Sequence, residues 1–356
     1  MQLDDADLDE LSDKYWKRFL SPKPVVLTTV QDNAVIKVKG NSLIVYDGDN
    51  SLTYQASAPN KPRAIVMTGW SGLVSIEAIR FCHDNNIAII LLDWSRDFLS
   101  IVAPPASQSA SLVRAQCRAD PVAGAKEIIR QKLAAYVSVK ALSAQQGSVY
   151  SHKADKVQSI PDLLAVEALA ARMAWPSIPP IRWRGGGPPI PPAWKLPYST
   201  RGRYKAGSPR HASHPVNAML NAAFAVTVGR LTAYLAAQGL CVSIGFLHSD
   251  KPNRHSLTYD AIEPLRPIIE RKVFDFISRR EFAANDFILT TDGTIRLADN
   301  LLRVLIAETA ISKRIINGVA SWVVDLIEPR VPLSNSVSFS PSIFFGHDKI
   351  HSLTNS

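Results

Sequence analysis

The chain reads VVLTTVQDNAVIKVKGNSLIVYDGDNSLTYQ from Val25 to Gln55. In this stretch, short runs of β-branched and aromatic residues alternate with turn residues, a pattern that predicts strands joined by hairpins. The pattern continues up to the pair Pro104-Pro105, where it ends. Strands are expected at Val25–Val30, Ala34–Val38, Ser42–Tyr46, Leu52–Gln55, Arg63–Thr68, Ile87–Leu92 and Phe98–Val102, around one helix at Ser75–His83. Residues 24–105 are therefore predicted to form a β-rich N-terminal domain.

The spacing of apolar residues changes to that of helices after Ser107. One long helix is predicted from His214 to Gln238, with Pro215 in its first turn and Gly239 after its end. At 356 residues the chain is long enough for two domains with separate cores. We predict an α+β fold in which four parts follow one another: an acidic extension (1–23), the β-rich domain (24–105), a mostly α-helical domain (106–333) and a C-terminal tail (334–356).

The composition favours a folded protein with an anionic partner. Lys and Arg number 40 against 31 Asp and Glu, and the net charge of +9 gives weak support to nucleic-acid binding. Cys82, Cys117 and Cys241 form no CxxC pair, so neither a disulfide framework nor a thiolate zinc site is predicted. The acidic N-terminal stretch has no apolar core of the kind a secretory signal needs. We therefore expect a cytoplasmic protein.

One stretch, from Ala218 to Ala237, is apolar enough to suggest a membrane span. It contains Asn221 and a central Arg230, and an arginine at the centre of a span costs roughly 2.5–3.5 kcal/mol. We therefore interpret the stretch as the buried core helix of a protein that does not enter the membrane.

Residues 176–213 differ in composition from the rest of the chain. The segment is rich in proline, contains the run Gly185-Gly186-Gly187 and has no Asp or Glu, so irregular structure is predicted for it. Its basic residues are interleaved with aromatic ones: Arg182, Arg184, Lys195, Arg201, Arg203, Lys205 and Arg210 with Trp183, Trp194, Tyr198 and Tyr204. Such interleaving suits phosphate contacts and base stacking on single-stranded or frayed nucleic acid. The alternative is a solvated loop that its aromatic side chains attach to the domain.

A helix is predicted from Pro161 to Trp175, with Ser159 as its N-cap. Small and apolar residues fall on one face of this helix, at Ile160, Leu164, Ala171 and Ala174. Glu167 is assigned to the same face, and a buried carboxylate needs a cation, a hydrogen-bond donor or a metal ion. Two interpretations stay open at this point: a metal ligand, or an ion pair with an arginine such as Arg266.

A second candidate site lies within residues 245–264. His248 ends an apolar run, and Asp260 and Glu263 stand three positions apart, so one helical turn would place both carboxylates on the same face. Carboxylates with one imidazole suit Mn²⁺ or Mg²⁺ better than zinc. Each residue also has a structural interpretation: His248 at a strand end, Asp260 as an N-cap, and Glu263 paired with Arg266 at i+3.

Four stretches of the chain together resemble a known family. They are VEALAARMAW around Glu167, HPVNAMLNAAF at 214–224, GFLH at 245–248 and SLTYDAIEPLRP at 256–267. In their order and spacing, and with LVSIEAIRFCHDNNIAIILLD in the β-rich domain, they resemble the CRISPR-associated integrase of spacer acquisition, the Cas one family. The resemblance covers roughly residues 24–316. The chain departs from the family pattern at Ala168, usually Gly, and at His214, usually Asp.

This resemblance implies an N-terminal β-sandwich-like domain that dimerises and a mostly α-helical catalytic domain. It also implies a homodimer that assembles on DNA with a small ferredoxin-like partner. Glu167, His248 and Glu263 match the family's metal ligands, and Asp260 matches the acidic residue that supports them. A bound Mn²⁺ or Mg²⁺ is therefore expected.

The resemblance further implies a metal-dependent DNA endonuclease and integrase, which inserts spacer DNA into CRISPR arrays by attack of a 3′-hydroxyl on a phosphodiester. Double-stranded DNA with 3′-hydroxyl ends and CRISPR array DNA are the expected partners. The basic residues predicted to contact DNA are Arg182, Arg184, Lys195, Arg201, Arg203, Lys205, Arg254 and Arg266. Three alternatives remain: a transposon-encoded relative with the same chemistry, a non-catalytic DNA-binding scaffold on the same fold, and a cytosolic helical hydrolase.

Overall fold

The computed structural model describes residues 26–29, 33–58, 61–62, 64–69, 71–85, 87–92, 98–102, 109–175, 178–185, 187–196, 198, 212–252, 254–291 and 293–328. The predicted extension (1–23) and tail (334–356) lie outside these residues. The chain divides into two compact units. Unit 1 takes its residues from Met1–Ser109, Ser177–Cys241 and Ile269–Ile311, and unit 2 from Ala110–Pro176, Val242–Ile268 and Ser312–Ser356. Each unit is thus assembled from segments that are distant in the sequence.

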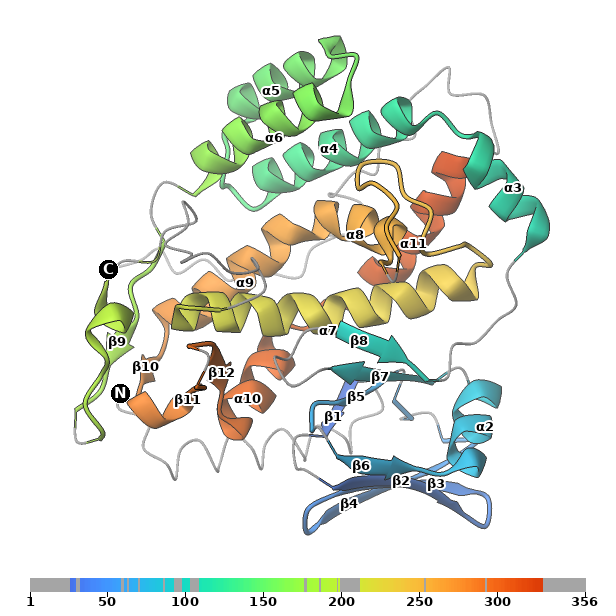
Figure 1. The fold of residues 1–356 in the computed structure, drawn as a ribbon, viewed down its shortest axis with the longest axis vertical. Coiled ribbons are helices and arrows are strands. Elements are labelled where there is room, and N and C mark those ends of the chain that lie inside the picture. Colours follow the sequence, from blue (N-terminus) through green and yellow to red (C-terminus); the bar gives the residue numbers. More distant parts are fainter. Residues whose placement is uncertain are drawn as a thin grey trace, which may run out of the picture. The chain divides into compact units, whose positions relative to one another are not determined.

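Two small sheets form the N-terminal part of unit 1 (Figure 1). The first has the order β1-β5-β7-β8 and consists of β1 (Val26–Thr29), β5 (Ala64–Met67), β7 (Ala88–Leu92) and β8 (Phe98–Ile101). Its first three strands are parallel, and β8 runs antiparallel to β7. The second has the order β4-β3-β2-β6 and consists of β4 (Asn50–Gln55), β3 (Ser42–Asp47), β2 (Ala34–Lys39) and β6 (Gly72–Val74).

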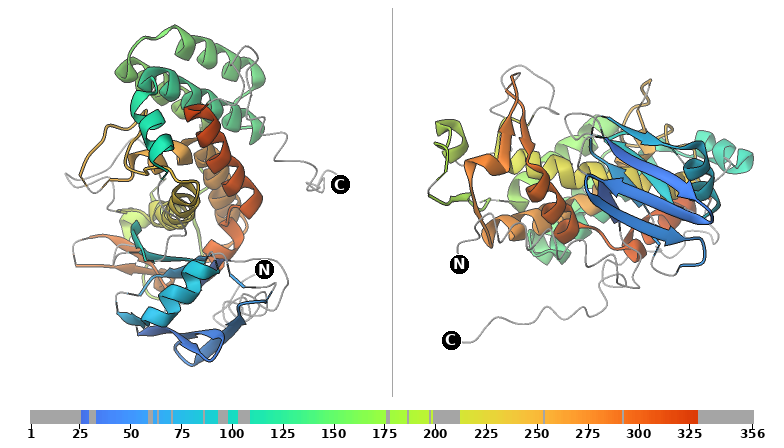
Figure 2. Two further views of the ribbon diagram at one scale, coloured as in Figure 1. Left: turned by 90° about the vertical axis from the view of Figure 1, so that its right-hand side faces the viewer. Right: turned by 90° about the horizontal axis from the view of Figure 1, so that it is seen from below.

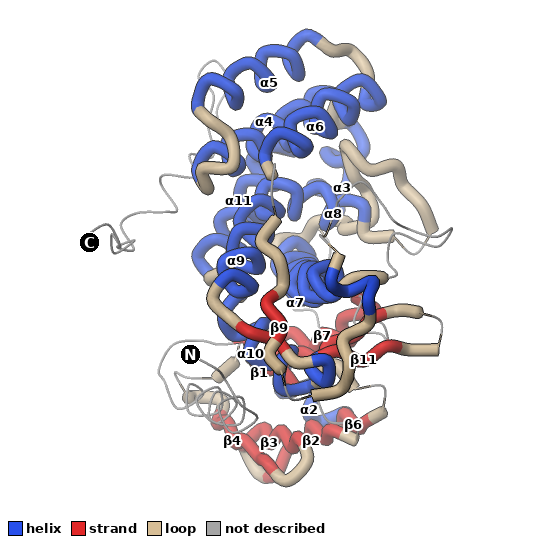
Figure 3. The backbone as a smooth tube through the Cα atoms, turned by 90° about the vertical axis from the view of Figure 1, so that its left-hand side faces the viewer, coloured by secondary structure: helices blue, strands red, loops and turns tan. Residues whose placement is uncertain are grey.

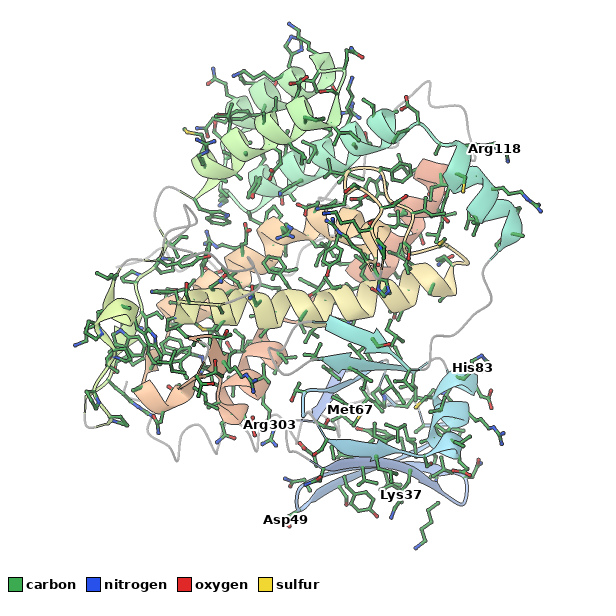
Figure 4. The ribbon with its side chains drawn as sticks, in the orientation of Figure 1. Lys37, Asp49, Met67, His83, Arg118 and Arg303 are labelled. Carbon is green, nitrogen blue, oxygen red and sulfur yellow. The ribbon has the colours of Figure 1, made fainter. Side chains whose placement is uncertain are left out.

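The core of this part lies between the sheets and helix α2 (Ile76–Asp84). Along β2, Ala34 and Ile36 are buried while Lys37 is exposed, the alternation expected for a sheet with one solvated face. Figure 2 shows the two sheets as layers on either side of α2. Figure 4 marks Met67, a member of the core, and Lys37 on the outer face of its sheet. The predicted strands before α3 (Ala110–Arg118) are confirmed to within a residue or two.

Strand β6 is the element of the N-terminal part that sequence reasoning missed. It pairs in parallel with β2, and the N–H of Ser75 donates to the carbonyl of Ile36 at 2.9 Å. A Cβ at Gly72 would lie 2.6 Å from the carbonyl oxygen of Ala34, so glycine permits this close approach. Its three residues are too short a run for a local pattern to identify as a strand.

Helix α7 (Pro215–Ala237) is the long buried helix of unit 1. It packs against β7, β8, β12 (Ile295–Leu297) and α10 (Asp299–Thr309). A Cβ at Gly229 would lie 2.5 Å from Cγ2 of Ile90, so helix and strand approach closely. Among the described residues, α7 is long and apolar enough to cross a membrane, but 83% of its most apolar window is buried within the structure. This burial supports its interpretation as a core helix.

Part of the Pro-rich segment is regular, so the prediction of irregular structure throughout residues 176–213 was wrong. Strand β9 (Arg182–Trp183) pairs in parallel with β10 (Glu281–Phe282), and the N–H of Arg184 donates to the carbonyl of Phe282 at 2.9 Å. A 3₁₀ helix, η1, covers Pro192–Lys195. The partner strand lies far along the chain, and composition cannot reveal such a partner. A second 3₁₀ helix, η3 (Ala284–Asp286), then leads from β10 into the hairpin of β11 (Phe287–Leu289) and β12.

Unit 2 is helical in its described residues. Its elements are α3, α4 (Pro121–Ser138), α5 (Ala144–Lys156), α6 (Ile160–Ala174), α8 (Ser256–Ile262), the 3₁₀ helix η2 (Glu263–Leu265) and α11 (Lys313–Ile327). Helix α9 (Arg266–Ser278) follows η2 and continues along the chain into unit 1. Helices α4, α5 and α6 lie side by side (Figure 3), and Ser159 caps α6 as predicted. The α+β fold class, with strands first and mostly helices after them, is confirmed.

The buried face of α6 differs from the predicted one. Leu163, Ala170 and Ala174 are buried, whereas Leu164, predicted to face inward, is 41% exposed. Glu167 stands four positions after Leu163 and three before Ala170, so it lies on the face that is buried. The assignment of the face failed because alanine is spread around the whole of α6, and apolar periodicity therefore selects no single side.

Candidate active site

Lys132 brings two glutamates together within unit 2. It lies on the buried face of α4, and its Nζ is 2.5 Å from Glu167 Oε1 and 2.6 Å from Glu263 Oε2. Glu167 is carried by α6, and Glu263 begins η2 directly after α8. Because α4 packs against both α6 and η2, the two carboxylates share one ammonium group.

Both oxygens of Glu263 have a cationic partner. Oε1 accepts a hydrogen bond from Arg266 Nε at 2.6 Å, and Oε2 accepts one from Lys132. Burial raises the pKa of Glu263, but the positive charges of Arg266 and Lys132 outweigh burial and lower this pKa to about 2. Burial likewise lowers the pKa of Lys132, but Glu263 and Glu167 outweigh it and raise that pKa above its ordinary value. Lys132 and Glu263 are therefore both charged at neutral pH.

Asp260 holds the loop that carries His248. Its buried carboxylate accepts the backbone N–H groups of Phe246 at 2.5 Å, Leu247 at 3.0 Å and His248 at 2.9 Å. Its Oδ1 also lies 2.6 Å from Nδ1 of the His248 ring. This contact assigns the ring proton to Nδ1, so Nε2 is the nitrogen with an available lone pair. A Cβ at Gly245 would lie 2.9 Å from Asp260 Oδ2, which explains the glycine that begins the GFLH stretch.

The two arginines of this region that were predicted to contact DNA have different partners. The guanidinium of Arg254 lies 5.6 Å from the centroid of the Tyr259 ring, and the rings of Tyr259 and His248 are 6.1 Å apart. Arg266 instead pairs with Glu263 at i+3, which is the structural interpretation that the sequence left open. DNA contacts by either residue stay a prediction.

The structure gathers the predicted site residues in two pairs. Glu167 and Glu263 meet at Lys132, and His248 meets Asp260. The two pairs are close enough for His248 to contribute to the lowered pKa of Glu263. Among the residues that the structure describes, no group of three or more His, Cys, Asp or Glu side chains is arranged to hold a metal ion. Joint metal binding by Glu167, His248 and Glu263 stays a prediction.

The chemistry of these side chains fits a divalent cation. Two carboxylates and an imidazole with an available Nε2 are the oxygen and nitrogen donors that suit Mn²⁺ or Mg²⁺. Asp260 supplies the carboxylate that commonly orients a metal-binding histidine. A positive group, the Nζ of Lys132, already lies between the two glutamates. The site therefore accommodates a cation at its carboxylates, in the form of an ammonium group.

Sequence reasoning missed Lys132. The residue is 6% exposed and lies among the buried Ile128, Ile129 and Leu133 of α4. The signal was a lysine at helical spacing within an apolar stripe, since lysine is almost never fully buried without a partner. That signal predicts a buried partner for Lys132 but does not identify it.

The two tryptophans of the Pro-rich segment pack within unit 1. Trp183 stacks on Trp194 with ring centroids 6.1 Å apart, and each tryptophan contacts the ring of Phe287 at 5.8 Å. Trp194 is only 5% exposed, so its ring cannot receive a stacked base. For Trp194, the structure favours the alternative in which the aromatic side chains of the segment attach the loop to the domain.

The basic residues of the same segment divide into two groups. Arg182 and Lys195 are exposed and Arg184 is half-buried, and Arg182 also donates to the carbonyl of Ser278 at 2.9 Å. The other basic residues predicted in this segment, Arg201, Arg203, Lys205 and Arg210, lie outside the described residues. DNA binding by the segment stays a prediction.

The fold and the site define an α+β protein whose helical unit holds an acidic cluster, Glu167 and Glu263, beside the pair of His248 and Asp260. The family model described as CRISPR associated protein Cas1 matches residues 27–310. The chain therefore belongs to this family, and the resemblance predicted from the four motifs is confirmed.

Two curated relatives carry the family name. CRISPR-associated endonuclease Cas1 1 of Archaeoglobus fulgidus is 24% identical in an alignment of 302 positions that covers 77% of this chain and 81% of the relative. CRISPR-associated endonuclease Cas1 of Leptospira interrogans is 34% identical over 90 residues, which are 25% of this chain and 35% of the relative. The second similarity thus spans only a part of either chain.

Solved structures share the fold along most of the chain. A casposase bound to integration product has a TM-score of 0.69 at 22% identity, covering 91% of this chain and 99% of its own. A CAS1 protein from Thermotoga maritima has a TM-score of 0.66 at 14% identity, covering 85% and 96%. A chain of a Cas6-RT-Cas1–Cas2 complex has a TM-score of 0.63 at 17% identity, covering 86% of this chain and 35% of its own. At these identities the similarity concerns the fold.

Proposed function

We propose that this chain is a DNA endonuclease and integrase that inserts spacer DNA into CRISPR arrays. Family membership supports the proposal, because the curated relatives are named endonucleases and a casposase of similar fold was solved with its integration product. The observation that carries it is the convergence of Glu167 and Glu263 on one cation, in the same unit as a histidine held by Asp260. Acidic and imidazole ligands of this kind suit phosphodiester chemistry.

The proposed reaction is a transesterification. The 3′-oxygen of a DNA end forms a bond to a target phosphorus, and one phosphodiester bond of the target strand breaks. The attacking hydroxyl loses a proton and the departing oxygen gains one, so one phosphodiester replaces another and no external energy source is needed. Where water takes the place of the hydroxyl, the same exchange hydrolyses DNA, which corresponds to the endonuclease activity.

Glu167, His248 and Glu263 would hold a Mn²⁺ or Mg²⁺ ion during this reaction. When bound, the ion supplies positive charge that activates the attacking hydroxyl and stabilises the charge on the phosphate. The residues of the chain prepare these ligands. Asp260 keeps the proton of His248 on Nδ1, which leaves Nε2 available as a ligand. Arg266 holds Oε1 of Glu263 and thereby orients its carboxylate.

Basic side chains would supply the affinity for DNA. The net charge of +9 favours a polyanion, and Arg182, Lys195 and Arg254 are candidates whose surroundings the structure describes. Contacts with phosphates position DNA without reading its sequence. Each such contact contributes about 0.9 to the dependence of log affinity on log salt for a duplex.

The protein is proposed to be cytoplasmic and to form a homodimer through its N-terminal β-rich domain. The homodimer is proposed to work with a small ferredoxin-like partner. A chain of similar fold belongs to a Cas6-RT-Cas1–Cas2 complex, which supports a protein partner. The proposed substrates are double-stranded DNA with 3′-hydroxyl ends and CRISPR array DNA. A transposon-encoded integrase is the second candidate function, because the casposase structure is similar over 91% of this chain.

A strand-transfer assay tests these proposals. Purified protein, with and without a candidate small partner, is incubated with a short duplex bearing 3′-hydroxyl ends and a supercoiled plasmid that carries a CRISPR array. We expect joining with Mn²⁺ or Mg²⁺, and none with EDTA or with 3′-dideoxy ends. A second plasmid that lacks the array serves as a comparison. More joining to this plasmid than to the one with the array would favour the transposon-type function. No joining under any of these conditions would contradict the integrase proposal.

A further inference from the structure

The two glutamates of the candidate site are already neutralised by side chains of the protein. Lys132 Nζ bridges Glu167 and Glu263, and Arg266 occupies the second oxygen of Glu263. The side chains of Lys132 and Glu263 are each only 7% exposed, so water cannot replace these contacts freely. A divalent ion that binds both carboxylates therefore competes with a positive group that contacts both of them.

We propose that Lys132 is the resident counter-ion of this site and competes with the divalent ion for Glu167 and Glu263. Its ammonium group keeps the carboxylates of the buried Glu263 and the half-buried Glu167 paired. When the ion binds, Lys132 releases at least one of them. The inference rests on the proposed metal site, and it adds a residue that sets how tightly this site binds its ion.

Charge balance favours exchange of the Lys132 ammonium for the divalent ion over addition of the ion to the intact cluster. In the structure, two cationic side chains, Lys132 and Arg266, contact the carboxylates of Glu167 and Glu263. A divalent ion added to this cluster would leave uncompensated positive charge in a buried setting, which is unfavourable. Withdrawal of Lys132 from the carboxylates removes part of that excess.

The chemistry of lysine suits such an exchange. Its ammonium is a compact charge on a flexible four-carbon stem, so it can leave one partner without any change in the helix that carries it. Arg266 is less suited, because it is tied to Glu263 within the same helical turn at i+3. Of the two cations on Glu263, Lys132 is therefore the one that the ion displaces.

The test compares Lys132→Met with Lys126→Met. Methionine preserves the length and apolar stem of lysine and removes its charge. Lys126 lies on the same helix α4, but its Nζ donates to the backbone carbonyl of Asp155 at 2.9 Å and contacts neither glutamate in the structure. For the protein without DNA, calorimetry measures the Kd for Mn²⁺. Thermal unfolding is measured separately, once in EDTA and once in Mn²⁺.

We expect Lys132→Met to bind Mn²⁺ about tenfold more tightly than the wild type, because the two carboxylates no longer have to separate from the ammonium group before they bind the ion. In EDTA this variant should unfold at a lower temperature, and Mn²⁺ should raise its unfolding temperature by more than that of the wild type. Lys126→Met should match the wild type in both measurements.

Lys132→Gln covers the case in which the methionine variant does not fold. Glutamine can still donate one hydrogen bond to a carboxylate but carries no charge, and it should also bind Mn²⁺ more tightly than the wild type. Unchanged or weaker binding in the folded variants would overturn the inference, as would an equal gain in Lys126→Met. The integrase proposal is judged separately, since it stands or falls with strand transfer by the wild type.

Discussion

Each unit of the molecule contains a buried ion-pair arrangement, and the two arrangements differ in the number of charged side chains that take part. In unit 1, Arg303 of α10 pairs with Asp47 of β3 at 3.0 Å, with side chains 7% and 1% exposed. In unit 2, Lys132 meets two carboxylates, and one of these meets a second cation. Figure 4 labels Arg303, whose pairing ties a helix to a strand of the N-terminal sheets. Burial of charge alone therefore does not identify a functional site.

The distinguishing features of unit 2 are a second carboxylate on the same ammonium group and an imidazole near the two carboxylates. His248 is 25% exposed and presents an available Nε2, whereas the Asp47 pair is enclosed. A purely structural ion pair needs neither a second carboxylate nor an accessible histidine. This comparison predicts that substitutions at the site in unit 2 affect catalysis as well as stability, and that substitutions at the pair in unit 1 affect stability alone.

The largest effect is expected for Glu263→Gln and His248→Ala. Each removes a proposed metal ligand, so strand transfer should fall about a thousandfold or more, equivalent to about 4 kcal/mol in the activation free energy. The fold and most of the DNA affinity should persist, because the basic surface is unchanged. The measurements are the strand-transfer rate, circular dichroism and DNA titration.

Glu77→Gln is the matched control for the carboxylate change, since Glu77 is an exposed residue of α2. It should retain the wild-type rate. If Glu263→Gln joined DNA as fast as this control, the assignment of the acidic cluster as the active site would be wrong.

A smaller effect, on stability, is expected for Asp47→Asn. Removing one partner of a buried ion pair leaves the other charge uncompensated, and we expect a loss of about 3 kcal/mol in the free energy of unfolding. Urea titration followed by circular dichroism measures this loss. Strand transfer per folded molecule should not change. A reduced rate at full folding would show that the pair in unit 1 contributes to function, and the contrast between the units would then fail.

The smallest effect concerns the N-cap of α7. His214 Nδ1 accepts the N–H of Val216 at 3.2 Å, and Nε2 lies 3.1 Å from the carbonyl of Leu196. Burial lowers the pKa of His214 below 6.5, and backbone contacts with Leu196 and Trp194 oppose this only in part. The pKa in the folded state is therefore below that in the unfolded state. The stability that the cap contributes is fully present above pH 6.5 and is lost as the pH falls through the folded-state pKa.

We expect this cap to contribute about 1 kcal/mol, the usual worth of an N-cap side chain. Urea unfolding at about pH 7.5 and about pH 5 measures the difference between wild type and His214→Asp. Aspartate caps a helix in its charged form, so the variant should lack the loss that begins below pH 6.5. If the free energy of unfolding had the same pH dependence in both proteins, protonation of His214 would not weaken the N-cap of α7.

Local sequence patterns predicted the regular part of the fold well. The hairpin strands β2, β3 and β4 show β-branched alternation between clear turns, and α7 has a long apolar pattern between proline and glycine. Strand β9 was missed because its partner β10 lies far along the chain. The stacking surface predicted for Trp194 was wrong because Phe287 and Trp183 cover its ring.

The sequence by itself determined the fold class, the family and the set of residues to consider, because these depend on periodicity and on the order of short motifs. Only the tertiary structure decided what those residues contact. Lys132 lies 35 positions before Glu167 and 131 before Glu263, and no local pattern encodes contacts at such separations. They arise from the packing of α4 against α6 and η2, which brings one buried ammonium within reach of two carboxylates that must then be paired.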